Sequence, residues 1–251
     1  MVVENSLIEN RNKPLAFAPI TMIEGDQGSG KSNMAASEAV DITFANATSI
    51  ILADGHEFRC SPVLDEAGYP SIGKVRVHLP TKDLIVKCPA GSCVVAEDVR
   101  IYANFHFYGI RAVYFTTAQI IEHLNDGTIR YGYLYFDEHY KDANARENGS
   151  VVVKAITKLS NQMRKKHLHV SYITPFARQL DWIERASVRK RIYCQEYNEE
   201  THIITYTIQE KGKKGTRTKT YDASVYFPYY RTDEHFAMGD NEVGKAIRAA
   251  Q

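Results

Sequence analysis

The sequence predicts an α/β fold with a mainly parallel central sheet and helices on both of its faces. One observation is that apolar, β-branched segments with strand character alternate along the chain with segments of helical periodicity. Another is that a glycine-rich loop, "IEGDQGSGKS", joins the first strand segment to the first helical segment. Strands that alternate with helices favour parallel pairing, because each crossover helix covers a face of the sheet.

Length and composition are those of an ordinary globular protein. The chain has 251 residues, 44% apolar and 24% charged, which suits one large domain or one domain with an insertion. The net charge is +1, so any basic surface must be local. The amino-terminal stretch carries two glutamates and lacks the apolar run of a signal peptide, and no segment approaches the ~20 apolar residues of a membrane span. We therefore expect a soluble chain.

The first half of the chain predicts a strand over 17–23, a helix after Lys31 and a second buried strand over 48–54. From about 55 to about 108 the pattern changes to short strand-like runs interrupted by proline and glycine. We interpret this segment as a β-rich excursion from a core that spans about 17–195 of a single domain.

The second half predicts a helix over 115–127, with Thr116 or Thr117 as its N-cap and Gly127 as its stop. A strand over 131–138, an amphipathic helix over 151–166, a strand over 168–174 and a short helix in "ARQLDWIERA" follow. The remainder, about 196–235, predicts a β-rich extension with a hairpin tip at "EKGKKGTR".

The glycine-rich loop has the spacing of a phosphate-binding P-loop. Glycines let the backbone turn tightly, so that its N–H groups point at phosphate oxygens at the start of a helix. Lys31 is predicted to contact the β- and γ-phosphates, and the Ser32 hydroxyl to bind Mg²⁺. The predicted nucleotide-binding residues are Gly25, Asp26, Gln27, Gly28, Ser29, Gly30, Lys31, Ser32 and Asn33.

Two adjacent carboxylates follow the apolar strand segment "YLYF". In P-loop proteins an aspartate at the end of a neighbouring strand holds Mg²⁺, and this is the role predicted for Asp137. Glu138 is then placed to polarise an attacking water as a general base. The pair therefore favours hydrolysis, with water as the phosphate acceptor.

A second strand end and several arginines are further candidates for the catalytic site. Thr174 ends the segment "LHVSYIT", where a polar side chain can sense the γ-phosphate, although a hydroxyl there can equally serve the strand end alone. An arginine from the same or a neighbouring subunit commonly stabilises the transferred phosphoryl group. The candidates are Arg146, Arg164, Arg178, Arg185 and Arg189.

Three basic clusters lie in the second half of a nearly neutral chain, at 163–167, 188–191 and 211–219. A solvated surface explains most such runs, but their asymmetry also fits contacts with a phosphate backbone that do not read the bases.

The cysteines leave a zinc site open as an alternative to reduced thiols. Cys60, Cys88 and Cys93, with His56, could form a zinc site, although reduced thiols are the more usual interpretation of this spacing.

The motif order resembles a known family. "IEGDQGSGKS", "YLYFDEHY", "ANAR", "NQMRKKHLHVSYITP" and "ARQLDWIERASV" together resemble the additional-strand P-loop ATPases of the FtsK–HerA superfamily, over about 19–194. Within it, the sequence resembles small genome-packaging ATPases of membrane-containing and archaeal icosahedral viruses. It also resembles the zonular-occludens-toxin-like ATPases of filamentous phages.

The resemblance implies a RecA-like core that hydrolyses ATP with Mg²⁺, forms a homo-oligomeric ring (hexamer or pentamer) and translocates double-stranded DNA without sequence preference. It implies contacts with capsid or portal-vertex proteins, and a location in the host cytoplasm or on the virion. Arg185 matches the basic position of the family's "vD-x-x-iR" stretch and is the first candidate to act in trans, with Arg146 second. The family often has glutamine where this chain has Thr174.

Three other functions remain open on the sequence. They are extrusion of single-stranded DNA in phage morphogenesis, phosphoryl transfer to a small molecule, and nucleotide binding without turnover. A small-molecule kinase would need an acceptor pocket and a lid, and the Asp137–Glu138 pair favours water instead.

Overall fold

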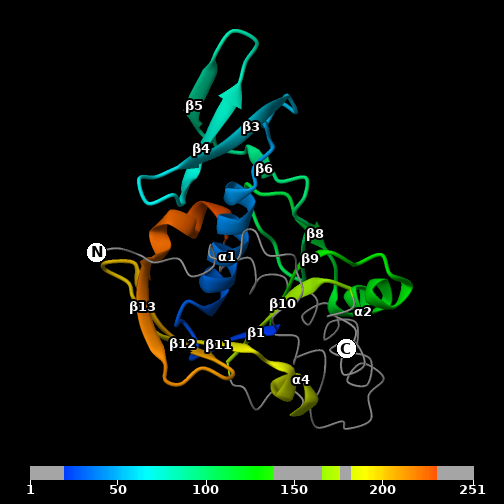
Figure 1. The fold of residues 1–251 in the computed structure, drawn as a ribbon, viewed down its shortest axis with the longest axis vertical. Helices are drawn as coiled ribbons and strands as arrows, with labels where there is room; N and C mark the ends of the chain where they lie inside the picture. Colours follow the sequence, from blue (N-terminus) through cyan, green and yellow to red (C-terminus); the bar gives the residue numbers. More distant parts are fainter. Residues whose placement is uncertain (1–19, 138–165, 176–181, 231–251) are drawn as a thin grey trace, which may run out of the picture.

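The computed structural model describes residues 20–137, 166–175 and 182–230. These residues form an eight-stranded sheet and a five-stranded sheet, with helices α1, α2 and α4 and the 3₁₀ helix η4 around them (Figure 1). The predicted helix over 151–166 lies outside the described residues, apart from its last residue.

The eight-stranded sheet has the order β13-β12-β11-β1-β10-β9-β7-β8. Its parallel part consists of β11 (Lys190–Asn198), β1 (Ile20–Gly25), β10 (Leu168–Thr174), β9 (Gly132–Asp137), β7 (Ile101–Ala103) and β8 (Val113–Tyr114). The strands β12 (Ile203–Glu210) and β13 (Arg217–Asp222) continue the sheet in antiparallel pairing. The predicted mainly parallel sheet is therefore confirmed.

Each face of this sheet packs into its own hydrophobic cluster, because side chains alternate between the faces along every strand. One cluster joins Ile23 and Ile173 to helix α1 (Lys31–Ala45). The other joins Met22 and Tyr172 to helix α2 (Thr117–Asp126). Helices thus cover both faces, as the sequence predicts.

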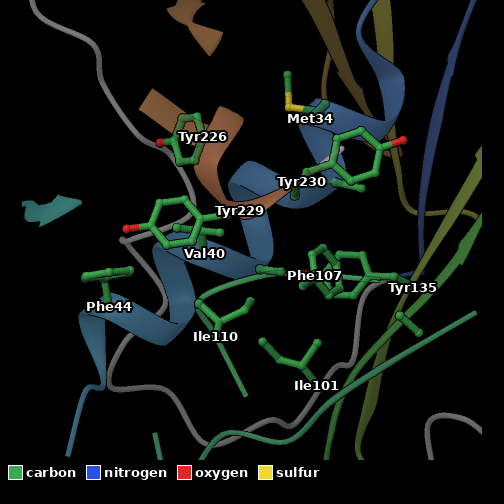
Figure 2. Packing of buried hydrophobic residues seen from close by; sticks show 14 of the residues in the cluster. Met34, Val40, Phe44, Ile101, Phe107, Ile110, Tyr135, Tyr226, Tyr229 and Tyr230 are labelled. Atoms are coloured by element: carbon green, nitrogen blue, oxygen red, sulfur yellow. The ribbon is translucent and has the colours of Figure 1, made fainter. Parts of the chain in front are cut away.

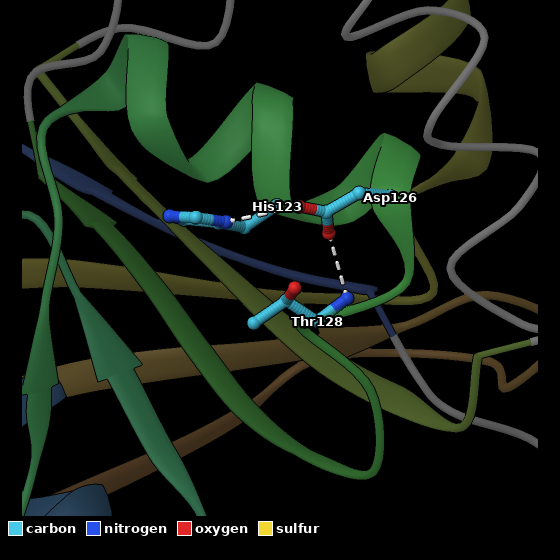
Figure 3. Close-up of polar contacts among 3 residues, drawn as sticks. All are labelled: His123, Asp126 and Thr128. Carbon is cyan, nitrogen blue, oxygen red and sulfur yellow. Dashed lines mark hydrogen bonds and ion pairs between the residues drawn. The ribbon is translucent and has the colours of Figure 1, made fainter.

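Helix α2 begins and ends where its sequence signals predict. The Thr116 hydroxyl accepts a hydrogen bond from the Gln119 amide, and the Gln119 side chain accepts one from the Thr116 amide. At the other end, Asp126 accepts a 2.8 Å hydrogen bond from the Thr128 amide and contacts His123 at 3.2 Å (Figure 3). Hydrogen bonding from Thr128 lowers the pKa of the Asp126 carboxyl.

The five-stranded sheet is antiparallel, in the order β5-β4-β3-β2-β6. Its strands are β2 (Ser49–Ile51), β3 (Glu57–Leu64), β4 (Pro70–His78), β5 (Asp83–Lys87) and β6 (Cys93–Val95). The strands β3, β4 and β5 project from the body beyond α1 (Figure 1). On its inner face, Val75 and Val77 join the cluster that contains α1.

The C-terminal extension packs on α1 through tyrosines of β13 and η4 (Ala223–Tyr229). Phe44 of α1 meets the ring of Tyr229 edge to face at 5.6 Å, and Val40 lies in the same cluster (Figure 2). Tyr226 donates a 2.8 Å hydrogen bond to the buried carboxylate of Asp41 on α1. Hydrogen bonding satisfies a carboxylate that would otherwise be costly to bury.

Three strand assignments differ from the sequence analysis. The predicted strand over 48–54 contains β2, which belongs to the five-stranded sheet and not to the core. The segment Ile101–Ala103, which falls inside the predicted excursion, forms β7 of the parallel core. In the extension, the strand run ends at Asp222 and continues as the 3₁₀ helix η4. Strand composition indicates burial but not the partner strand, which depends on distant parts of the chain.

Candidate functional site

The site lies at the carboxyl ends of the parallel strands, where the loop 26–30 connects β1 to α1. Gly28 and Gly30 have φ values of +79° and +87°, in the left-handed region that favours glycine. Gly30 is also the N-cap residue of α1, with no side-chain cap, so the first amides of the helix are open to a ligand. An anion placed there would meet these amides and the positive end of the helix dipole.

Lys31 and Ser32 occupy the first turn of α1. The Lys31 Nζ donates a 2.6 Å hydrogen bond to the main-chain oxygen of Asp26, so the ammonium group reaches back over the loop. The Ser32 Oγ donates a 2.8 Å hydrogen bond to Oδ2 of Asp137, the last residue of β9. The structure thus brings together two predicted metal-binding residues that are 105 positions apart in sequence.

The strand that carries the loop and the strand that carries Asp137 are not neighbours. Strand β10 lies between β1 and β9 and pairs in parallel with both. An additional strand therefore separates the two halves of the site, which is the arrangement that the sequence resemblance implies for a RecA-like core. The chain has a RecA-like P-loop fold.

Oxygen donors of this kind suit Mg²⁺, which prefers a carboxylate, a hydroxyl and phosphate oxygens. A second observation fits a ligand at the loop. The Ser29 Oγ is buried and finds no hydrogen-bond partner among the described residues. A buried hydroxyl without a partner is costly, so a phosphate oxygen above the loop would satisfy it.

Other predicted loop residues have different surroundings. Three residues of the loop are exposed to solvent: Asp26, Gln27 and Gly28. Asn33 is buried, and its side-chain oxygen accepts a 2.8 Å hydrogen bond from Tyr221 of β13. The Asn33 side chain therefore ties the first turn of α1 to the C-terminal extension.

Thr174 ends β10 and is fully buried, in register with Glu24 of β1. Because β10 lies between the loop strand and the acidic strand, the sensor position predicted for Thr174 falls between the two halves of the site. Glu138 and Arg146, the other predicted catalytic residues of this region, lie outside the described residues.

Arg185 lies in α4 (Trp182–Ser187), which precedes the amino end of β11. The loop 26–30 follows the carboxyl end of β1, and β1 and β11 run parallel. Arg185 is therefore at the opposite edge of the sheet from its own P-loop. A role at a nucleotide requires that the nucleotide be bound by another subunit.

Asn104 is a residue that the sequence analysis missed. It follows β7, and its side-chain oxygen accepts a 2.8 Å hydrogen bond from the Asp137 amide. Its side-chain nitrogen donates another 2.8 Å hydrogen bond to the Asp137 carbonyl. Asn104 thus fixes both main-chain groups of the metal-binding candidate. An asparagine after a buried strand segment was the available signal, but that segment was assigned to the excursion.

Replacing Asn104 by alanine is expected to lower the apparent Mg²⁺ affinity of ATP hydrolysis by about 10- to 100-fold, because residues behind a metal ligand orient it. The measurement is turnover against Mg²⁺ concentration, beside metal-free nucleotide binding. Asn104→Asp keeps the acceptor for the Asp137 amide but sets a carboxylate oxygen against the Asp137 carbonyl, so its defect should be at least as large. Equal losses of Mg²⁺ affinity and metal-free nucleotide binding would contradict this positioning role.

The cysteines give no support to a zinc site. No group of three or more His, Cys, Asp or Glu residues is placed to hold a metal ion within the described ranges. Burial raises the pKa of the Cys60 and Cys88 thiols to about 11. Both side chains are therefore neutral thiols at physiological pH in the absence of a metal.

Comparison with known proteins gives structural similarities only. No protein-family model and no curated sequence matches the chain. The N-terminal domain of zonular occludens toxin from Neisseria meningitidis is similar at 16% identity and a TM-score of 0.48, over 85% of this chain and 99% of that one.

Two further solved structures are similar. One is B204, the DNA-packaging ATPase from Sulfolobus Turreted Icosahedral Virus, at 13% identity and a TM-score of 0.43, over 80% of this chain and 96% of that one. The other is a KaiC-like protein from Pyrococcus horikoshii, at 12% identity and a TM-score of 0.40, over 81% and 84%. Among the helices that the structure describes, none is both long and apolar enough to cross a membrane.

Proposed function

We propose that the chain is an ATP-hydrolysing motor that translocates double-stranded DNA as a homo-oligomeric ring, and that it packages a viral genome. The observation that carries the ATPase part is the 2.8 Å contact between Ser32 and Asp137 across the additional strand β10. It joins the phosphate loop to a carboxylate in the arrangement that binds a nucleoside triphosphate with Mg²⁺.

Each residue of the site has a defined task in this proposal. The loop amides and Lys31 would hold the phosphates, and Ser32 and Asp137 would hold Mg²⁺, which would supply positive charge beside them. Glu138 follows Asp137 directly in sequence and accepts a proton from the attacking water. Thr174 orients the γ-phosphate from the intervening strand, and Arg185 or Arg146 of a neighbouring subunit stabilises the transferred group.

The DNA part of the proposal is supported by the motif order and by the basic clusters. The clusters at 188–191 and 211–219 lie wholly within the described residues. In the second, Lys213 and Arg217 both pair with Glu210, whereas Lys214 is exposed at the hairpin tip. Partial pairing leaves some of this positive charge for phosphate contacts.

The decisive test measures ATP turnover with and without duplex DNA, on protein whose assembly state is determined in the same sample. We expect duplex DNA to stimulate turnover, and this stimulation to fall as salt rises, because phosphate contacts release counterions. Glu138→Gln should lose at least about a hundredfold in turnover, within the range for general acid–base catalysis, while it still binds ATP.

Other outcomes separate the alternatives. Turnover indifferent to DNA, with no ring under any nucleotide condition, would leave an ATPase that is not a DNA motor. Stimulation by single-stranded DNA alone would favour the phage extrusion function. Transfer of the γ-phosphate to a nucleoside or metabolite would favour a kinase, and unchanged turnover in Glu138→Gln would exclude the proposed base.

A further inference from the structure

The outer face of the five-stranded sheet carries an excess of positive charge. Side chains alternate along β4, so that Val75 and Val77 are buried against the α1 cluster while Lys74 and Arg76 are exposed on the other side. Lys87 of β5 is the direct register partner of Lys74. We call these residues, with Arg59 of β3, the outer basic face: Arg59, Lys74, Arg76 and Lys87.

None of the four cations has a salt-bridge or hydrogen-bond partner for its side chain among the described residues. The two carboxylates on the same face are engaged elsewhere. Asp83 contacts His78 at 2.9 Å, and Glu57 accepts a hydrogen bond from Ser49 of β2. The four cations of the face therefore outnumber its two carboxylates.

The arrangement carries an energetic cost that a ligand would relieve. Lys74 and Lys87 are directly opposite on neighbouring strands, and like charges in that position destabilise a sheet. Ile85, the register partner of Arg76, is 57% exposed between the cations and leaves no carboxylate at the centre of the face. Binding of a polyanion with regularly spaced charges would therefore reduce the repulsion between these cations.

We infer that the outer basic face binds the phosphate backbone of double-stranded DNA. The inference deepens the proposed function and rests on it for the identity of the anion. Residues two apart in a strand rise by about 6.8 Å, so their side chains can reach different phosphates of one DNA strand. Lys74 and Arg76 therefore suit a backbone with regularly repeated phosphates, and Arg76 can hold its phosphate with two parallel hydrogen bonds.

The site is separate from the ATPase centre. It belongs to β3, β4 and β5, which project from the body, whereas the P-loop follows β1 in the other sheet (Figure 1). The sequence analysis singled out basic clusters only in the second half of the chain, because the cations here are dispersed. Their grouping depends on strand register, which places residues 59, 74, 76 and 87 on one surface.

The test compares two double variants of the full chain by fluorescence anisotropy with labelled duplex DNA, over a series of salt concentrations. Lys74→Ala/Arg76→Ala is expected to reduce the slope of log K against log salt by about 1.8, because each phosphate contact contributes about 0.9. At 0.1 M salt the affinity should fall at least about tenfold. The matched control, Arg100→Ala/Arg130→Ala, removes two exposed arginines from loops of the other sheet.

The control should keep the wild-type slope, and turnover without DNA should be unchanged in both double variants. Equal binding by both variants and the wild type would overturn the inference while leaving the proposed motor intact. Polyglutamate that binds the wild type as tightly as duplex DNA would assign the face to an acidic protein and overturn it. Wild-type protein that binds no duplex at low salt would overturn both the inference and the proposed DNA function.

Discussion

Replacing Asp137 by asparagine is expected to lower ATP turnover by at least about a hundredfold, within the range that single electrostatic contacts supply in active sites. The substitution keeps the size of the side chain and its hydrogen bond from Ser32, but removes the negative charge that holds Mg²⁺. Nucleotide binding in the absence of metal should change little. The measurement is steady-state turnover beside metal-free nucleotide affinity.

The same prediction extends to the partner across the sheet. Ser32→Ala removes the hydroxyl that contacts Asp137 Oδ2, so both variants lose parts of one metal site. The double variant should therefore be scarcely worse than Asp137→Asn alone, because residues that act as a unit are not additive. Asp65→Asn is the matched control, since Asp65 lies in an exposed turn and its side chain accepts hydrogen bonds from the nearby amides of Ala67 and Tyr69.

If Asp65→Asn lowered ATP turnover as much as Asp137→Asn, the loss would reflect a general effect of charge or stability and not the metal site. Independent, additive losses in Ser32→Ala and Asp137→Asn would show that the two side chains do not share a ligand. Lys31→Ala is a further variant that tests a different contact. It removes the ammonium group that would bind the phosphates, so it should weaken nucleotide binding even in the absence of metal.

Local signals predicted those parts of the fold that depend on neighbouring residues. The capping residues of α2, the glycine loop before α1 and the bounds of β10 all follow from short stretches of sequence. The pairing of Ser32 with Asp137 was also predictable, because Asp137 ends one parallel strand and Ser32 begins the helix that follows another.

Sheet membership was not predictable in the same way. β2 and β7 are three residues each, and nothing in so short a segment says which distant strand will pair with it. The position of Asn104 depends on that assignment, since only a strand beside β9 brings it to Asp137. The roles of Glu138, Arg146 and Arg185 at a nucleotide stay predictions, the first two because they lie outside the described residues.

Replacing Gly25 by alanine is expected to lower both stability and nucleotide binding far more than the same change at Gly28. A methyl group at Gly25 would lie 2.3 Å from the main-chain oxygen of Cys194 and 2.6 Å from Ser29 Oγ. Cys194 is the register partner of Gly25 on β11, so relief would require that two paired strands separate. At Gly28 no atom lies within 4 Å, and the cost is that of a positive φ alone.

Overpacking against main chain costs roughly 3 kcal/mol or more, which corresponds to a fall of roughly 6–12 °C in melting temperature for a chain of this size. The left-handed conformation at Gly28 costs about 1 kcal/mol, or about 2–4 °C. Gly30→Ala should be intermediate, because its methyl group would meet the flexible end of the Ile204 side chain at 2.3 Å. Thermal unfolding and ATP affinity of the three variants, measured together, would test this order. Equal effects at all three positions would mean that backbone conformation alone, and not the contact between β1 and β11, requires glycine in this loop.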